Sequence, residues 1–187
     1  MLAGGIAIGS VAPLWGRNLR RTPLFTWGMV IAHLGVAVSL AGMASETGFI
    51  KEPLVAVNVG EARAVGPYQV TFAGLDPAAG PNWTALEATL EARRGDRDPL
   101  ILKPQSRMFS NPQTETNEAA IDTLLDGQLY LVLGKQDPSG RWQLRMWWKP
   151  FVTFIWLGGA MIAFGGFLAL MGRFRREKMS ARWRTAG

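Results

Sequence analysis

The sequence predicts a membrane protein with two or three transmembrane α-helices and a small extramembrane all-β domain, built as a barrel or a sandwich. The helices are predicted by two long uncharged stretches: the 24 residues between Arg21 and Glu46, and the 23 residues between Lys149 and Arg173. A helix needs about 20 apolar residues to cross the hydrocarbon core of a bilayer. The β domain is predicted by short runs between these stretches that alternate apolar and polar residues, a pattern typical of half-buried strands.

The composition excludes several kinds of chemistry. The 187-residue chain contains no cysteine, so disulfides, thiolate metal sites and a cysteine nucleophile are ruled out. It contains one histidine, which excludes a histidine-rich metal cluster supplied by this chain alone. A single histidine also makes a Ser-His-Asp or HExxH site hard to sustain. The informative features are therefore the membrane topology and that one imidazole.

Three uncharged segments bear on the number of membrane spans. We expect one transmembrane helix over residues 24–43 and another over residues 150–172, since each is bounded by abrupt charge. The first 16 residues are also uncharged, but they are few and rich in glycine. Residues 1–23 are therefore interpreted as an N-terminal apolar segment (a short span, a re-entrant segment or a truncated helix) and a basic link. A secretory signal is disfavoured, because the basic residues follow the apolar run instead of preceding it.

The placement of lysine and arginine predicts the orientation. The link before the first span holds three arginines, and residues 173–187 hold six basic residues, whereas residues 44–150 carry 11 basic and 13 acidic residues. Basic loops are retained in the cytoplasm, so we expect the tail 173–187 there and the domain at residues 44–149 in the periplasm, with the spans in a bacterial inner membrane. The net charge of +6 then reports topology and contact with membrane lipid. We expect no nucleic-acid partner.

Five runs in the middle of the chain predict strands. The third run is ambiguous between helix and strand, but the turn signals Gly80-Pro81 before it and Arg94-Gly95-Asp96 after it favour a strand. The last two runs flank Asp137-Pro-Ser-Gly140 and so predict a hairpin. Five or six short strands suggest a compact barrel or sandwich. The runs are residues 54–59, 68–72, 83–92, 128–133 and 142–147.

Residues 108–122 lack such a pattern. The segment holds several polar residues and Pro112. We therefore expect a structured loop, with one helical turn near residues 118–121.

The motif Trp147-Trp148-Lys149-Pro150 is expected to open the second span. Tryptophan prefers the headgroup region, the lysine amine extends toward water, and proline suits the first turn of a helix. We interpret the motif as an interfacial anchor.

Two glycine pairs lie inside the second span, Gly158-Gly159 and Gly165-Gly166. Small residues at this spacing give two faces on which another helix can approach closely. We expect that helix to come from this chain or from another subunit.

The only histidine, His33, lies near the middle of the first span, about 14 Å from its start at 1.5 Å per residue. An imidazole at that depth is costly unless its nitrogens are satisfied. It could hydrogen-bond a neighbouring helix, relay protons, or ligate haem iron. A relay finds no Asp, Glu or second His in the spans. Gly28, Ala32 and Gly35 leave space beside it for a flat macrocycle or for a close helix, and this pattern does not separate these two possibilities.

Four groups of residues, in the same order, resemble one known family. They are Trp27–Gly35, Gly80–Ala85, residues 116–121 with 129–134, and residues 142–150 leading into 155–158. Through them the chain, from about residue 27 onward, resembles the C-terminal part of the CcmF family of cytochrome c-type biogenesis proteins, the membrane haem lyases of system I. Several motifs in order make this resemblance specific.

The resemblance implies a role for His33. In that family a transmembrane histidine at this position is an axial ligand of an embedded b-type haem. It makes His33 the expected cofactor-binding residue and the expected ligand of the haem iron. In that family the second axial ligand is a histidine from another helix, and this chain has no second histidine. The embedded haem is thought to supply electrons that keep the transferred haem reduced.

The resemblance also implies that the chain acts with other components. The tryptophan-rich haem-handling loop of the family, and the external histidines that flank it, have no counterpart in this sequence. We therefore expect a C-terminal subunit of a split lyase, or a fragment, that is not active alone. The expected partners are the remaining part of the lyase, other cytochrome c maturation proteins, apocytochrome c, haem and membrane lipid.

Residues 44–150 contain no evident acid–base dyad or nucleophile, so catalytic residues stay unassigned. The family joins haem vinyl groups to the thiols of a CxxCH motif, which mainly requires positioning of two partners and control of the iron redox state. We interpret the β domain as a docking platform, with Arg107 and Arg145 as candidate contacts for haem propionates or a partner. The competing hypothesis is a non-enzymatic, membrane-anchored periplasmic scaffold in which His33 only hydrogen-bonds between helices.

Overall fold

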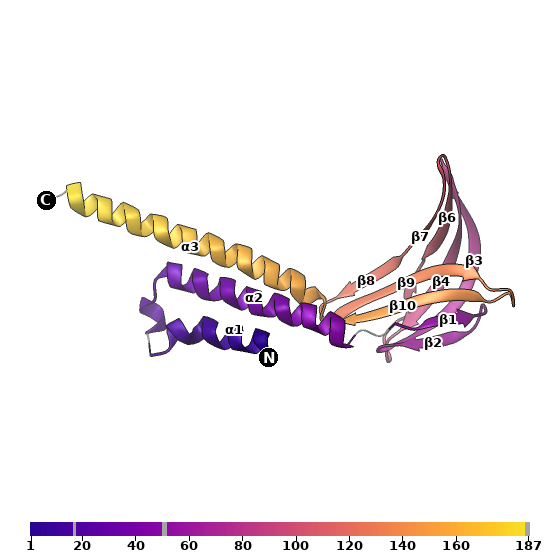
Figure 1. Ribbon diagram of the computed structural model, residues 1–187, viewed down its shortest axis with the longest axis horizontal. Coiled ribbons are helices and arrows are strands. Elements are labelled where there is room, and N and C mark those ends of the chain that lie inside the picture. The colour runs from indigo at the N-terminus through magenta and orange to yellow at the C-terminus, as the bar shows by residue number, and fades with distance from the viewer. Residues whose placement is uncertain (17, 50–51, 186–187) are drawn as a thin grey trace. The chain divides into compact units, whose positions relative to one another are not determined.

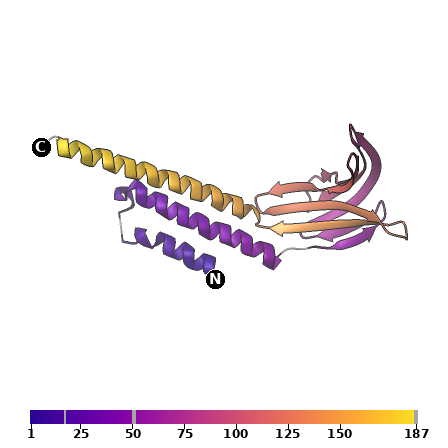
Figure 2. The same cartoon turned by 45° about the horizontal axis from the view of Figure 1, so that its top comes forward.

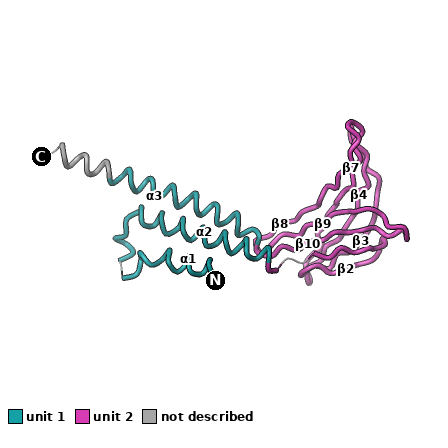
Figure 3. The backbone as a smooth tube through the Cα atoms, viewed as in Figure 1, with its two compact units in different colours: residues 1–47, 152–187 teal, residues 48–151 magenta. Residues whose placement is uncertain are grey.

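The computed structural model describes residues 1–16, 18–49 and 52–185, with side chains of the last helix described as far as residue 176 (Figure 1). The chain divides into two compact units, drawn in different colours in Figure 3. Residues 1–47 and 152–187 form a helical unit, and residues 48–151 form a β domain inserted between its two parts.

The helical unit contains three α-helices, α1 (Leu2–Val11), α2 (Leu24–Phe49) and α3 (Thr153–Thr185). Short 3₁₀ turns at Ala12–Leu14 and Leu19–Arg21 lie between α1 and α2. Both α2 and the Thr153–Arg176 part of α3 are long and apolar enough to cross a membrane. The 26 residues of α2 extend about 39 Å, more than the roughly 30 Å of a bilayer core.

The uncharged N-terminal stretch folds as the ten-residue helix α1. Its length is about 15 Å, half the thickness of a bilayer core. Pro13 lies in the 3₁₀ turn that follows the helix. Whether α1 is a short span, a re-entrant segment or a truncated helix stays a prediction.

The described residues of the β domain form ten strands in two antiparallel sheets (Figures 1 and 2). One sheet has four strands in the order β1-β10-β9-β8, and the other has the order β2-β3-β4-β6-β7, with β5 also paired to β4. The predicted class, membrane helices with a small all-β domain, is confirmed, and the domain is a sandwich. The strands are β1 (Leu54–Val57), β2 (Ala62–Val65), β3 (Tyr68–Gly80), β4 (Trp83–Arg93), β5 (Leu100–Leu102), β6 (Gln105–Ser110), β7 (Gln113–Glu118), β8 (Ala120–Leu124), β9 (Gly127–Gln136) and β10 (Trp142–Pro150).

Alternate residues of both sheets form the core between them. In β9, for example, Leu129, Leu131 and Leu133 are fully buried while the residues between them are half-buried. The same alternation in β4 buries Leu90 and Ala92. The strands predicted from period-2 runs are therefore confirmed, including the ambiguous run at residues 83–92 and the hairpin formed by β9 and β10.

The expectation of a loop with a helical turn in residues 108–122 is wrong. This segment contains the end of β6, all of β7 and most of β8. Every residue of β7 except Thr116 is exposed, so the apolar alternation that reveals a half-buried strand is missing. The strand exists because its main chain pairs with β6, and that pairing depends on tertiary neighbours more than on side-chain pattern.

The expectation that residues 147–150 open the second span is also wrong, while a place for Trp147 and Lys149 at the membrane interface stays a prediction. These residues end β10, and α3 begins only at Thr153. Trp148 is 7% exposed and belongs to the core of the sandwich. Pro150 pairs with Gly127 of β9 and lies beyond the residues of β10 that pair with β1, so its missing N–H removes no hydrogen bond of that ladder.

The motif Gly80–Ala85 forms the tip of the β3–β4 hairpin. The ring of Trp83 lies so close to Gly80 that a Cβ there would overlap it. The guanidinium of Arg107 also lies on this ring, 4.4 Å from the ring centroid, which is within range of a cation–π interaction. The N–H of Ser110 donates to the carbonyl of Asn82 at 2.9 Å. The motif therefore links the tip of the β3–β4 hairpin to the tip of the β6–β7 hairpin.

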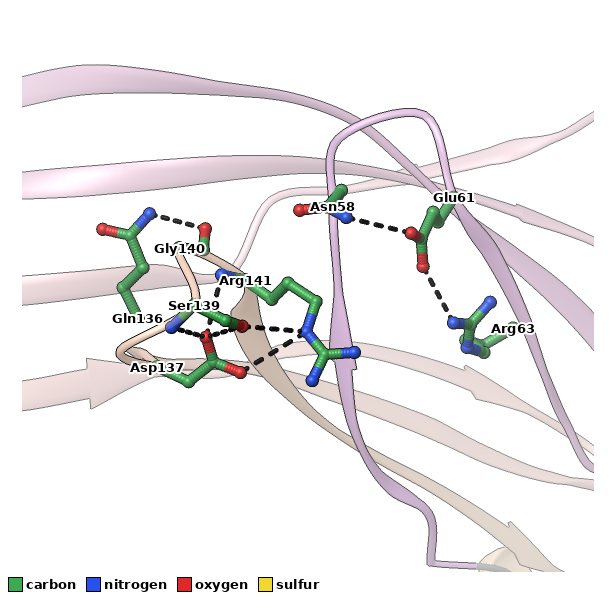
Figure 4. A network of polar contacts seen from close by, with 8 residues as sticks. All are labelled: Asn58, Glu61, Arg63, Gln136, Asp137, Ser139, Gly140 and Arg141. Carbon is green, nitrogen blue, oxygen red and sulfur yellow. Dashed lines mark hydrogen bonds and ion pairs between the residues drawn. The ribbon is translucent and has the colours of Figure 1, made fainter.

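Two turns of the β domain are held by polar side chains (Figure 4). Asp137 accepts hydrogen bonds from Ser139 N and Oγ at 2.8 and 2.5 Å and from Arg141 N at 3.0 Å. The bond from the Ser139 hydroxyl is the largest cause that lowers the pKa of the Asp137 carboxyl. In the β1–β2 turn Glu61 accepts a hydrogen bond from Asn58 and pairs with Arg63. These carboxylates are occupied in stabilising turns.

A charged cluster packs on the aromatic part of the core. Arg94 forms an ion pair with Asp126, and its guanidinium lies 5.6 and 5.5 Å from the ring centroids of Tyr68 and Trp148. The centroids of these two rings are 5.4 Å apart. Trp148 also lies against Gly66, where φ is +54° and a Cβ would overlap the indole. The hydrogen bond from Arg94 is the main cause that lowers the pKa of the Asp126 carboxyl.

We expect Asp126→Asn to lower the free energy of unfolding by about 0.5–1 kcal/mol at pH 7, the upper range for a partly exposed ion pair. Because the folded pKa is below the ordinary value near 4, the contribution is present above that value. It is lost as the pH falls through the folded pKa, so the two proteins should converge in acid. Denaturant unfolding followed by near-UV circular dichroism between pH 7 and pH 2 measures this.

The matched control is Asp98→Asn, which changes an exposed carboxylate. In this variant the free energy of unfolding should differ between pH 7 and pH 2 by as much as it does in the parent chain. Equal stability of Asp126→Asn and the parent chain at pH 7 would contradict a stabilising role for the pair.

Candidate functional site

His33 lies on an exposed side of α2 in the helical unit. Its Nδ1 is 2.8 Å from the carbonyl oxygen of Met29, one turn earlier in the helix. A carbonyl can only accept, so Nδ1 carries the proton of the neutral ring and donates it. The other ring nitrogen, Nε2, then keeps the lone pair that a metal ligand needs. The helix itself thus selects a tautomer that can ligate.

A hollow of about 400 Å³ adjoins the imidazole between α1 and α2. Its lining is mainly apolar, and Gly9 and Ser10 supply small residues on the α1 side. Apart from the neighbouring main chain of α1 itself, no described atom lies within 4 Å of the position that a Cβ on Gly9 would occupy. His33 therefore borders a space with little side-chain bulk. The lining residues are Ile6, Gly9, Ser10, Pro13, Met29 and His33.

Glycines at seven-residue intervals determine how α2 packs on α3. They are Gly28, Gly35 and Gly42 on α2, and Gly158, Gly165 and Gly172 on α3. A seven-residue interval brings each glycine back to the same side of its helix. Small residues at such positions let two membrane helices bring their main chains together.

The contacts at these glycines are between main chains. A Cβ on Gly35 would lie 2.6 Å from the carbonyl oxygen of Gly158, and a Cβ on Gly165 would lie 2.5 Å from the nitrogen of Ala32. A Cβ on Gly42 would lie 2.8 Å from the nitrogen of Ile155. No side chain fits at any of these positions without moving a helix, so the glycines hold the pair at its closest approach.

A side-chain hydrogen bond supports the same contact. The hydroxyl of Ser39 donates to the carbonyl oxygen of Ile155 at 3.2 Å. Hydrogen bonds between membrane helices contribute about 0.6 kcal/mol on average. The bond is modest in energy, but it adds to the fixed register of α2 against α3.

This packing determines which way His33 faces. Successive residues of a helix are about 100° apart, so His33 lies about 140–160° around α2 from Gly28 and Gly35. The imidazole is thus on nearly the opposite side of α2 from α3. The space beside Gly28 and Gly35 is filled by the main chain of α3, so it holds a close helix and no macrocycle.

The prediction of small-residue faces on the second span is confirmed for one face. Gly158 and Gly165 contact α2, whereas no described atom lies within 4 Å of a Cβ built on Gly159 or Gly166. The helix that approaches the first face comes from this chain.

Sequence reasoning missed two parts of this site. The seven-residue spacing of the glycines is visible in the sequence and could have predicted the α2–α3 contact. The hollow beside His33 could not be predicted, because the contribution of Ile6, Ser10 and Pro13 depends on how α1 folds back on α2.

The donor set around His33 is limited. Within the part of the chain that the structure describes, no three His, Cys, Asp or Glu residues lie close enough together to hold a metal ion. A bare ion is therefore not supported. A planar cofactor that is itself a ligand to its metal, and needs only axial donors, is compatible with one imidazole.

Arg107 and Arg145 are both engaged within the β domain. Besides its contact with Trp83, Arg107 lies 3.7 Å from the carboxylate of Glu118 and donates from Nε to Gln105 at 2.7 Å. Arg145 lies over the ring of Trp147 at 5.9 Å. These contacts give both arginines structural roles, and their proposed contact with propionates stays a prediction.

Two helices of the chain are long and apolar enough to cross a membrane and pack against each other at glycines. The β-sandwich is inserted in the sequence between them, and one helix carries an imidazole that can act as a ligand. These features define a class of membrane-anchored β-sandwich proteins. Within this class the chain belongs to the CcmF family. Residues 48–150 match the family described as CcmF C-terminal beta-sandwich, which confirms the resemblance stated from the sequence.

Relatives extend the similarity over the helices. The chain is 35% identical over 175 residues to the cytochrome c-type biogenesis protein CcmF of Escherichia coli, covering 94% of this chain and 27% of that protein. It is 33% identical over 190 residues to the cytochrome c-type biogenesis protein ccl1 of Rhodobacter capsulatus, covering 98% of this chain and 29% of that protein. The chain thus spans under a third of the length of either relative.

A solved structure has the same fold. The structure titled Cytochrome c Heme Lyase CcmF matches with a TM-score of 0.61 and 22% sequence identity, over 90% of this chain and 28% of that one. At this identity the match supports the fold.

We expect Gly165→Leu to separate α2 from α3 and to lower the stability of the helical unit by about 1–3 kcal/mol, the usual cost of overpacking. Gly166→Leu is the matched control, because the same side chain at the next residue meets no described atom within 4 Å of its Cβ. It should change stability by less than about 0.5 kcal/mol. Thermal unfolding in detergent, followed by circular dichroism at the helix signal, measures both. Equal losses in the two variants would contradict the glycine contact.

Proposed function

We propose that this chain is the C-terminal part of a membrane haem lyase of cytochrome c maturation. His33 is an axial ligand of a b-type haem embedded in the membrane, and the β-sandwich is a docking platform on the periplasmic side. The observation that carries the proposal is the hydrogen bond from His33 Nδ1 to Met29 O, because it leaves Nε2 free to ligate. The names of the relatives, which are cytochrome c biogenesis proteins, give the proposal its biological setting.

The residues around His33 suit a flat, apolar cofactor. The hollow beside the ring is lined by small and apolar side chains and lies on the side of α2 away from α3. Haem supplies an iron centre that exchanges single electrons. The chain's own residues orient the imidazole through Met29, fix the rotation of α2 through the glycines, and keep water away with apolar helix faces.

A haem held by two imidazoles needs two histidines, and this sequence contains a single histidine, His33. The second axial ligand therefore comes from another chain or from the remaining part of the lyase. That part, other cytochrome c maturation proteins and apocytochrome c are the proposed partners. The proposed location is a bacterial inner membrane, with the basic residues of the link and of the tail 173–187 in the cytoplasm.

We expect His33→Ala to abolish or strongly weaken a b-type signal in the reduced-minus-oxidised spectrum of the chain purified with its co-purifying subunits. Removing one axial imidazole changes the ligand field of the iron, so the spectrum responds even where haem is retained. Ser39→Ala is the matched control, since it alters a polar residue of the same helix that contacts α3.

An unchanged spectrum in His33→Ala would remove this residue as a ligand and leave the scaffold hypothesis. That hypothesis expected a hydrogen bond from His33 to a neighbouring helix, whereas the described bond lies within α2, to Met29. Oligomeric state should be measured on the same sample, because two copies of the chain could supply two imidazoles.

The proposed orientation can be tested with single cysteines, because the chain has none of its own. We expect Gln69→Cys in β3 to react with a membrane-impermeant maleimide in intact spheroplasts. Asn18→Cys, in the basic link, should react only after the membrane is permeabilised. The reverse pattern would contradict a periplasmic β domain.

A further inference from the structure

The strand formed by residues 113–124 changes sheets at Ala119. Before this residue β7 pairs with β6 of the six-stranded sheet, and after it β8 pairs with β9 of the four-stranded sheet. The register of β8 ends at Ala120 opposite Leu131. Beyond that point β9 continues to Gln136, where among the described residues it pairs only with β10, and β7 runs with β6 toward the tip of their hairpin (Figure 1). The side chain of Lys135 in β9 still reaches Glu115 of β7. We call the region beside the outer edge of β7, where these two side chains meet, the slot.

One wall of this slot is a strand edge with unused main-chain groups. Ser110 N–H and Pro104 C=O both point toward β4, so the alternation of an antiparallel ladder directs Gln105, Arg107 and Phe109 toward β7. The residues of β7 opposite these three bond back to β6. The main chains of Gln113, Glu115 and Asn117 then point outward. Among the described residues no strand pairs with them.

The floor of the slot is partly apolar. Thr84, Leu86, Ser106, Met108 and Glu115 line a hollow of about 370 Å³. Leu86 and Met108 are 36% and 41% exposed, although they occupy the face of the sheet that forms the core elsewhere. The four-stranded sheet leaves this part of the face uncovered.

One further observation concerns the outer edge of β7. The contact that spans the slot is an ion pair between Glu115 and Lys135 at 3.0 Å. With the lysine side chain 74% exposed, that pair is weak and easily displaced.

We infer that β7 receives an extended segment of a haem-free polypeptide, which adds a strand to the six-stranded sheet inside this slot. Main-chain hydrogen bonds to Gln113, Glu115 and Asn117 hold the segment, and one of its alternate side chains covers Leu86 and Met108. This is strand addition at an exposed edge. The inference rests on the proposed function for the identity of the polypeptide, which is an acceptor still lacking its haem.

The chemistry of the edge favours such an occupant. Recognition through main-chain groups tolerates many sequences, as a platform for several cytochromes requires. Residues 113–118 carry two carboxylates, those of Glu115 and Glu118. Arg107 already pairs with Glu118, so the carboxylate open to a cationic segment is that of Glu115, whose partner Lys135 is largely exposed. A folded partner presents few free main-chain groups, whereas an extended chain presents all of them.

The test measures binding of a fluorescein-labelled peptide of about 12 residues that contains CxxCH and carries net positive charge, to the full chain in detergent. We expect Glu115→Pro to weaken binding about tenfold, because proline removes an outward N–H and leaves the pairing with β6 intact. Ala64→Pro is the matched control. Phe72 N donates to Glu61 O, so the N–H of Ala64 points outward on β2, the strand at the other edge of the same sheet. The affinity of Ala64→Pro for the peptide should equal that of the parent chain.

A second variant keeps the test decisive if Glu115→Pro folds poorly. In the double variant Glu115→Cys, Lys135→Cys, a short bis-maleimide closes the slot in a chain otherwise free of cysteine. Cross-linking should abolish peptide binding, and the uncross-linked variant should bind. A peptide methylated on alternate backbone nitrogens should also fail to bind.

Equal affinity of Glu115→Pro and the parent chain, or equal binding of the methylated peptide, would overturn the inference. So would a dimer of the chain, seen by light scattering, that Glu115→Pro dissociates, because the edge would then pair two copies. These outcomes are independent of the haem spectrum. Loss of the spectrum in His33→Ala with unchanged peptide binding in Glu115→Pro would reject this inference alone.

Discussion

Direct contact between the main chains of α2 and α3 is the constraint on which the helical unit depends. In a bilayer, lipid tails solvate apolar side chains as well as a neighbouring helix does, so close packing and hydrogen bonds must hold helices together. Gly28 and Gly35 meet Gly165 and Gly158 of α3, while Gly42 and Gly172 lie against the main chains of Ile155 and Phe25. This packing defines which side of α2 faces α3. The direction of His33 follows from that packing, because it lies on the opposite side of the same helix.

The β domain is stabilised by different physics. Its core is built from alternate residues of two sheets, and burial of apolar surface from water is the main driving force. A charged group packs on the aromatic part of this core where Arg94 lies against Tyr68 and Trp148 while pairing with Asp126. The indole of Trp148 can approach this closely because Gly66 and Gly127 have no side chain in its way.

Both proposed roles depend on something the chain does not supply. In the proposed function the helical unit supplies one axial donor, where a haem held by two imidazoles needs two. The six-stranded sheet presents at β7 an edge that no described strand pairs with, beside a partly apolar hollow. In each case the group that would bind is already in place: the ring of His33 is oriented and the strand β7 is formed without the second axial ligand or the added segment. Such preorganisation lowers the entropic cost of assembly, which suits one component of a larger membrane machine.

The sequence by itself determined the two apolar helices, the strands with period-2 alternation and the single imidazole, because charge gaps and alternation are local signals. The spacing of the glycines was also there to be read. Only the tertiary structure decided that residues 113–118 form a strand, since an edge strand exposed on both faces has no apolar period. Only it placed Trp148 in the sandwich core instead of the membrane interface, because a tryptophan beside a span suits either surrounding until its neighbours are known. The hollow beside His33 and the slot beside β7 likewise arise where segments distant in sequence meet, and no local pattern encodes such a meeting.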